Sequence, residues 1–123
     1  MRRPGASFFQ TSLHAAWSAW YNLDSTMRVG GSAHIDDIKN DFDACAESIT
    51  QVCVAIRPGG ISDGDRVKID QILLGEENNS ESSGLEELLE KWEMELNLSP
   101  SEKTGWDAMA TQVKNACEAL ARI

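Results

Sequence analysis

The spacing of apolar residues between Ile35 and Ile56 constrains the fold of this chain most strongly. Apolar side chains recur there at steps of three and four over three heptads, which is the period of an amphipathic helix. The stripe consists of Ile35, Ile38, Phe42, Cys45, Ile49, Val52 and Ile56. Strand-like alternation is nearly absent from the chain. The sequence therefore predicts a six-turn helix over residues 35–56 and a helical fold.

Four further segments show the same period, so helices are also expected over residues 7–23, 62–74, 85–96 and 99–120. The apolar face of the first segment is Phe9, Leu13, Ala16, Trp17, Trp20 and Leu23, and that of the second is Val67, Ile69, Ile72, Leu73 and Leu74. The third segment has Leu85, Leu88, Leu89, Trp92 and Leu96, and the fourth has Trp106, Met109, Val113, Cys117 and Leu120. The expected helix starts are Ser7 with Gln10, Ser32, Ser62 with Asp65, Ser83 with Glu86, and Ser99 with Pro100 and Glu102. Residues 24–32 are expected to form a loop, and Gly75 is expected to end the third helix.

These patterns predict a compact all-α bundle of about five amphipathic helices that forms a single domain over residues 1–123. A chain of 123 residues has the length of one ordinary domain. The longest and most regular helix, over 35–56, is expected to be the central element. The polar stretch 76–84 is expected to be a flexible acidic loop.

The charge balance excludes several classes of partner. The chain has 11 Lys+Arg and 20 Asp+Glu, a net charge of -9. Binding to DNA, RNA or anionic membranes depends on basic residues, so direct nucleic-acid binding is not expected. No apolar run approaches the roughly 20 residues of a transmembrane helix. The three cysteines, Cys45, Cys53 and Cys117, fit reduced, buried thiols and hence a cytoplasmic protein.

The residues that most often carry enzyme chemistry form no recognisable arrangement here. His14 and His34 lie in different segments without a second ligand at helical spacing, so they do not indicate a zinc site. A calcium loop starting at Asp63 would need oxygen ligands where Val67 and Leu74 stand. The sequence therefore predicts no catalytic residues, no metal site and no cofactor.

One stretch resembles a known family. Residues 52–65, followed by Ile69 and residues 72–73, look like the helix-turn-helix signature of TerB-like (tellurite-resistance-type) domains, an apolar helix followed by A-D-G-x-I-S-x-x-E and a second helix. Gly59, Ile61 and Ser62 match this pattern, and Asp65 stands where the family has Glu. Pro58 replaces the family's Asp, so metal binding is not expected to carry over. The resemblance, limited to residues 52–73, implies a helical stress-response or membrane-associated scaffold.

Acidic residues are concentrated in the C-terminal half. Residues 1–57 hold 5 basic and 6 acidic residues, whereas residues 58–123 hold 6 basic and 14 acidic residues. Eight of these acids lie between Glu76 and Glu95, with one base, Lys91. On a helix, Glu86, Glu90 and Glu93 share one face opposite the leucines. The speculative partner-binding surface is Glu86, Glu87, Glu90, Glu93 and Glu95, which would attract a basic protein partner.

Aromatic residues are concentrated near the N-terminus, since five of the eight lie within the first 21 residues. These are Phe8, Phe9, Trp17, Trp20 and Tyr21. Trp17 and Trp20 fit the core stripe, whereas Phe8 and Tyr21 lie away from its centre. The cluster therefore belongs either to the core or to a hydrophobic interface that binds a partner or forms a homodimer.

The sequence thus predicts a non-enzymatic inhibitor or adaptor, of the immunity or anti-defence type, that contacts a basic partner through an acidic surface. The alternatives are a TerB-like scaffold and, further, a small-ligand carrier or enzyme.

Overall fold

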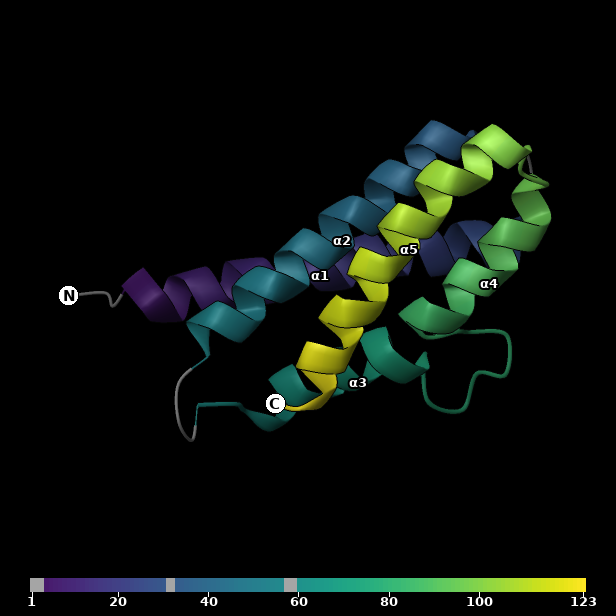
Figure 1. Ribbon diagram of the computed structural model, residues 1–123. Coiled ribbons are helices and arrows are strands. Elements are labelled where there is room, and N and C mark those ends of the chain that lie inside the picture. Colours follow the sequence, from purple (N-terminus) through teal and green to yellow (C-terminus); the bar gives the residue numbers. More distant parts are fainter. Residues whose placement is uncertain (1–3, 31–32, 57–59) are drawn as a thin grey trace.

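A computed structural model describes residues 4–30, 33–56 and 60–123, with side chains described from Phe8 onward. Over these residues the chain forms five α-helices and no strand (Figure 1). The helices are α1 (Pro4–Val29), α2 (Ile35–Ala55), α3 (Asp63–Leu74), α4 (Leu85–Leu96) and α5 (Pro100–Ala121). The prediction of a single all-α domain built from five helices is confirmed.

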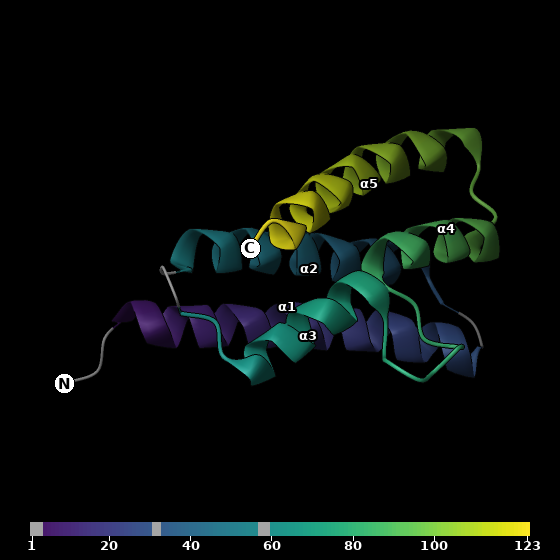
Figure 2. The ribbon, with the colours of Figure 1, turned by 90° about the horizontal axis from the view of Figure 1, so that it is seen from below.

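The longest helix, α1, packs against most of the others. α1 and α2 run side by side in opposite directions, and α5 covers the far side of α2 (Figure 2). α3 and α4 pack along α1, and α5 also contacts both of them. The expectation that the helix over 35–56 is central therefore holds only in part. α2 packs mainly against α1 and α5, whereas α1 packs against α2, α3 and α4.

The predicted loop over 24–32 is wrong for residues 24–29, which continue α1. Asp, Ser and Thr have weak helix propensity, so this extension depends on tertiary contacts. Asp24 is fully buried, and Met27 packs against the core. The helix ends at Gly30, which has φ of +78° and donates its N–H to the carbonyl of Thr26. A left-handed residue at a helix end is usually glycine, because glycine has no Cβ.

Two of the predicted helix starts are confirmed. The Ser62 hydroxyl accepts the N–H of Asp65 at the start of α3. At the start of α5, Ser99 and Glu102 form a complete capping box, and each side chain accepts the backbone N–H of the other residue. Pro100 occupies the first helical position, where its missing N–H costs nothing.

The other three predicted starts are wrong. α1 begins at Pro4, so Ser7 lies inside the helix. α2 is capped by His34, whose Nδ1 accepts the N–H of Asp36, whereas the predicted cap Ser32 lies outside the described residues. α4 follows Gly84 without a side-chain cap, because Ser83 is buried and makes other contacts.

The core is formed by all five helices. The predicted apolar stripe of α5 is entirely buried, and so are the central residues of the α2 stripe. Trp20, Trp92 and Trp106 are among the largest fully buried side chains. Phe42 meets Trp106 edge to face at 5.6 Å between ring centroids, which joins α2 to α5.

Candidate functional site

The acidic residues of α4 lie on the surface, and three of them share a face as expected. Glu86 and Glu90 are exposed, and Glu93 is half-buried. This face lies on the side of α4 next to α5, because Glu93 pairs with Lys103 of α5 at 3.0 Å. Glu87 and Glu95 are exposed elsewhere on α4. The five predicted residues therefore cover much of the solvent side of this helix rather than one narrow stripe.

Two of these five carboxylates are neutralised by ion pairs. Glu87 pairs with Lys91 at 3.7 Å, and the Lys103 that binds Glu93 also binds Asp107 at 2.8 Å. The hydrogen bonds from Lys103 to Asp107 and Glu93 raise the pKa of Lys103. Among the residues that the structure describes, Glu86, Glu90 and Glu95 pair with no basic side chain.

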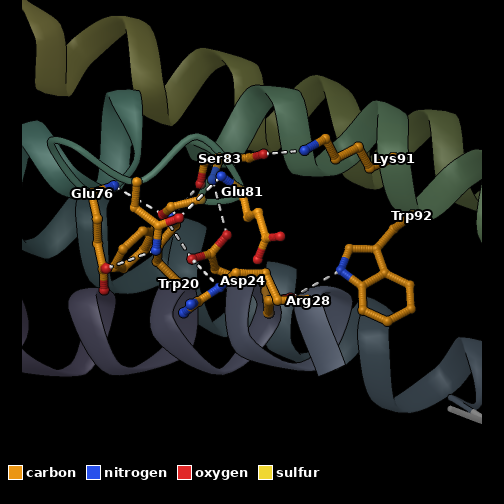
Figure 3. Close-up of polar contacts among 11 residues, drawn as sticks. Trp20, Asp24, Arg28, Glu76, Glu81, Ser83, Lys91 and Trp92 are labelled. Atoms are coloured by element: carbon orange, nitrogen blue, oxygen red, sulfur yellow. Dashed lines mark hydrogen bonds and ion pairs between the residues drawn. The ribbon is translucent and has the colours of Figure 1, made fainter. Parts of the chain in front are cut away.

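The acidic loop over 76–84 lies across the C-terminal part of α1 and is hydrogen-bonded to it (Figure 3). Asp24 is the centre of these contacts. Its Oδ1 accepts the N–H of Ser83 at 2.9 Å, and its Oδ2 accepts the hydroxyl of Ser82 at 2.8 Å. The Ser82 hydroxyl in turn accepts the N–H of Glu76. Arg28 Nε lies 3.3 Å from Asp24 Oδ2, an ion pair without hydrogen-bond geometry.

Two further bonds tie this loop and α4 to α1, and a third joins α4 to the loop. Trp20 donates its indole N–H to the Ser83 carbonyl at 2.8 Å, and Lys91 donates to the Ser83 hydroxyl. Trp92 donates its indole N–H to the Leu23 carbonyl at 3.3 Å. The flexibility of loop 76–84 stays a prediction. In the structure, these hydrogen bonds hold the loop against α1.

The aromatic cluster does not form one surface. Phe9 and Trp20 are buried in the core, and Trp17 is half-buried. Tyr21 is 43% exposed and stacks on Trp17 at 5.2 Å between ring centroids. Phe8 is also exposed, but the helical rotation of 100° per residue places it on the opposite flank of the buried stripe from Tyr21. The predicted hydrophobic interface is therefore divided between the core and two separate sides of α1.

The sequence pattern missed an exposed apolar surface on α3. Val67 is 55% exposed and Leu74 is 77% exposed, although both belong to the predicted apolar face of this helix. Ile69 and Ile72 are fully buried instead. Val67 and Leu74 are seven residues apart and so lie on one side of the helix, opposite Ile69. The spacing in the sequence shows that they lie on a different side of the helix from Ile69, and the structure shows which of the two sides faces the core.

An open groove of about 600 Å³ runs beside this exposed side of α3. It is lined by Val67, Asp70, Gln71, Leu74, Gly75, Glu76 and Glu77. Three of the lining side chains are carboxylates and none is basic. The groove therefore combines apolar side chains with negative charge.

A second hollow of about 420 Å³ lies where α3, α4 and α5 meet. It is lined by Leu73, Leu74, Glu86, Lys114, Cys117, Glu118 and Ala121. Leu74 lines both hollows, so Glu86 of α4 and the acids of the α3 groove belong to neighbouring parts of one surface. The structure thus brings one of the predicted site residues next to an apolar centre that was not predicted.

The histidines and cysteines lie apart from these hollows, except for Cys117. His14 is exposed on α1 and stacks on Trp17, whereas His34 caps α2. Within residues 4–30, 33–56 and 60–123, no three His, Cys, Asp or Glu side chains are grouped as metal ligands.

The three thiols are free, and two of them are buried. Burial raises the pKa of Cys117 to about 12 and raises the pKa of Cys45 further. Cys53 is half-buried, and its pKa is raised by that partial burial. A neutral thiol is a poor nucleophile, so these positions do not resemble activated cysteines.

Searches of family models, curated proteins and solved structures find no match to this chain. The resemblance to TerB-like domains therefore stays a prediction. Pro58 and Gly59 of the resembling stretch lie outside the described residues, and Ser62 is seen as the N-cap of α3. Among the described helices, none has the combination of length and apolar character needed to cross a bilayer.

Proposed function

We propose that this chain is a non-enzymatic protein of the inhibitor or adaptor type that binds a basic protein partner through its acidic surface. One observation carries the proposal. Of the eight acidic residues between Glu76 and Glu95, only Glu87 and Glu93 pair with a basic side chain of the described residues. Exposed and unpaired carboxylates produce a negative potential that speeds association with a positive surface.

The arrangement around Leu74 supports the same proposal. Protein interfaces commonly have an apolar centre surrounded by a polar rim. Here the exposed Leu74 lies between two hollows whose walls include Glu76, Glu77 and Glu86. A partner that covers Leu74 would therefore also contact acidic side chains.

The test is a matched pair of charge reversals. Glu86→Lys with Glu90→Lys changes two exposed carboxylates one helical turn apart on α4. Asp43→Lys with Glu47→Lys makes the same charge change at the same spacing on the exposed side of α2. The net charge of the two double variants is identical, so a difference between them reports the location of the binding surface rather than the total charge.

Captured partners would be measured with immobilised protein at low and at high salt. We expect capture of a basic protein that weakens steeply as salt rises, is lost in the α4 variant and is retained in the α2 variant. Equal capture by both variants would refute the proposal. The TerB-like scaffold and the ligand carrier or enzyme stay alternatives that no contact in the structure favours.

A further inference from the structure

Helix α3 carries apolar side chains on two opposite sides. A surface helix normally has one apolar stripe, which faces the core. In α3, Ile69 and Ile72 occupy that position and are fully buried. Val67 and Leu74 form a second, shorter stripe that no described part of the chain covers. Their Cα atoms are separated by about 10 Å along the helix, which is two turns.

The groove beside this second stripe has walls that are held by contacts within the protein. Gln71 accepts the indole N–H of Trp17 at 2.7 Å, and the N–H of Gly75 donates to the Gln71 carbonyl at 2.8 Å. The N–H of Glu76 donates to the Ser82 hydroxyl at 2.9 Å. Because these walls are already ordered, a ligand that enters the groove would lose little binding free energy to ordering them.

The charge around the groove selects the occupant. Asp70, Glu76 and Glu77 line it together with Val67 and Leu74, and none of its lining side chains is basic. The complementary ligand therefore has apolar side chains with positive charges beside them. A second copy of this chain is a poorer match than a basic partner, because its net charge of -9 is repelled by the acidic groove.

We propose that this α3 groove binds a basic amphipathic helix of the partner protein. Such a helix places apolar side chains at i, i+3, i+4 and i+7 on one face, and its two turns match the spacing of Val67 and Leu74. Its Lys and Arg residues would then lie next to Asp70, Glu76 and Glu77. This inference rests on the proposed function, since it names the kind of segment by which the basic partner is bound.

The probe for this inference is a fluorescein-labelled synthetic peptide of about 18 residues, which is five helical turns. The peptide contains only leucine and lysine, with the leucines at amphipathic helical spacing. A second peptide has the same composition in an order that distributes the leucines around the helix. Binding to the full chain would be measured by fluorescence anisotropy. We expect the amphipathic peptide to bind and the rearranged peptide to bind at least about tenfold more weakly.

The apolar contribution is tested with a double variant, Val67→Asn with Leu74→Asn. Both side chains are exposed, so the fold should be retained, which unchanged circular dichroism and an unchanged urea midpoint would verify. The matched control is Val54→Asn, which alters a 78% exposed valine on α2. We expect the dissociation constant of the amphipathic peptide to rise at least about fivefold in the double variant and to stay within about twofold in the control.

The electrostatic contribution is tested by Asp70→Lys with Glu77→Lys, compared with the Asp43→Lys and Glu47→Lys variant on α2. We expect the groove variant to weaken peptide binding at least about tenfold and more strongly at low salt than at high salt. Equal weakening by both variants would show that the peptide responds only to net charge, and that result would overturn the inference.

The outcomes separate this inference from the proposed function. In one outcome, the peptide loses binding only in the Glu86→Lys and Glu90→Lys variant of α4 and binds the groove variants normally. That result would refute the α3 groove as the binding site, but it would still support an acidic binding surface on α4. No measurable binding of the amphipathic peptide to the unaltered chain would also overturn the inference, whatever the capture experiment shows. A dimer in light scattering that Leu74→Asn dissociates would assign the groove to a second copy and so refute a basic partner helix.

Discussion

Replacing Asp24 by alanine is expected to destabilise the fold more than replacing any exposed carboxylate. Asp24 is fully buried and accepts two hydrogen bonds from the loop after α3, one from the N–H of Ser83 and one from the hydroxyl of Ser82. Among the described residues, neither donor has another acceptor. Arg28 lies one helical turn away at 3.3 Å. The alanine variant leaves a buried N–H without its acceptor and a guanidinium without its counter-ion.

The magnitude follows from these contacts. A hydrogen bond to a charged group contributes about 1.5–3 kcal/mol, and removal of one partner from a buried ion pair costs about 3–5 kcal/mol. The Arg28 side chain keeps 24% of its surface exposed, so water partly replaces the lost carboxylate. We therefore expect a loss near the lower end of that range, about 3 kcal/mol of unfolding free energy. The Asp24→Asn variant keeps one acceptor oxygen, so its loss should be smaller.

The assay is urea unfolding followed by tryptophan fluorescence and by circular dichroism. With a slope of about 2 kcal/mol per molar urea, the expected loss lowers the midpoint by about 1.5 M. Asp43→Ala on α2 is the control, because an exposed carboxylate of this kind changes stability by no more than about 0.5 kcal/mol. A midpoint for Asp24→Ala within about 0.3 M of the control would refute the reasoning.

A protease that cleaves after glutamate provides a second readout of the same change. The loop over 76–84 contains Glu76, Glu77 and Glu81, and the contacts to Asp24 hold it against α1. We expect cleavage within this loop to become faster in Asp24→Ala under native conditions, since opening of the loop no longer breaks those bonds. Rapid cleavage of the unaltered chain would show instead that the loop opens readily despite these contacts.

Three further predictions concern packing, capping and thiol reactivity. Gly84→Ala is expected to cost about 3 kcal/mol in urea unfolding, because its Cβ would lie 2.0 Å from the Leu73 carbonyl oxygen, a backbone atom that cannot move aside. The hydrogen bond from the Ser99 N–H lowers the pKa of the Glu102 carboxyl. The stability that this contact contributes is therefore complete at neutral pH and is lost as the pH falls through the lowered pKa of the folded state. Glu102→Gln should make the loss of stability at acidic pH less steep, and an unchanged stability–pH profile would contradict this. Cys53 should react with a thiol reagent faster than the two buried cysteines, because their pKa values are raised further. Peptide mapping after partial labelling measures the three rates, and equal rates would contradict this reasoning.

The helices that the sequence predicts best are those whose signals are local. The apolar stripe over 35–56 and the start signal at Ser99, Pro100 and Glu102 depend only on residues within a few positions of one another. These signals act through the helical period and through the orphan N–H groups of the first turn. Both can be read without knowledge of the tertiary structure, and both are found in the structure where they were expected.

The C-terminal part of α1 could not be predicted in the same way. Asp24, Ser25 and Thr26 favour a loop by local preference. Their helical conformation is stabilised by groups about 60 residues away, since Asp24 binds Ser82 and Ser83. Ser83 does not cap α4, because Gly84 stands at the N-cap position and the Ser83 hydroxyl accepts a hydrogen bond from Lys91. A serine near a helix start has several possible partners, and only the tertiary structure decides which of them it meets.

The acidic surface and the α3 groove differ in how far the sequence could predict them. Exposure of Glu86 and Glu90 follows from their position opposite the leucines of α4, so the sequence was sufficient for those residues. The exposure of Val67 and Leu74 does not follow from their apolar character, because α3 has apolar residues on both sides and either side could have faced α1. Asp65 helps to decide this choice: its side chain accepts the amide of Gln10 from α1, and it lies on the side of α3 that also carries Ile69 and Ile72. With Ile69 and Ile72 fully buried on that side and this contact joining residues 55 positions apart, Val67 and Leu74 face outward and form the apolar centre beside the acidic residues.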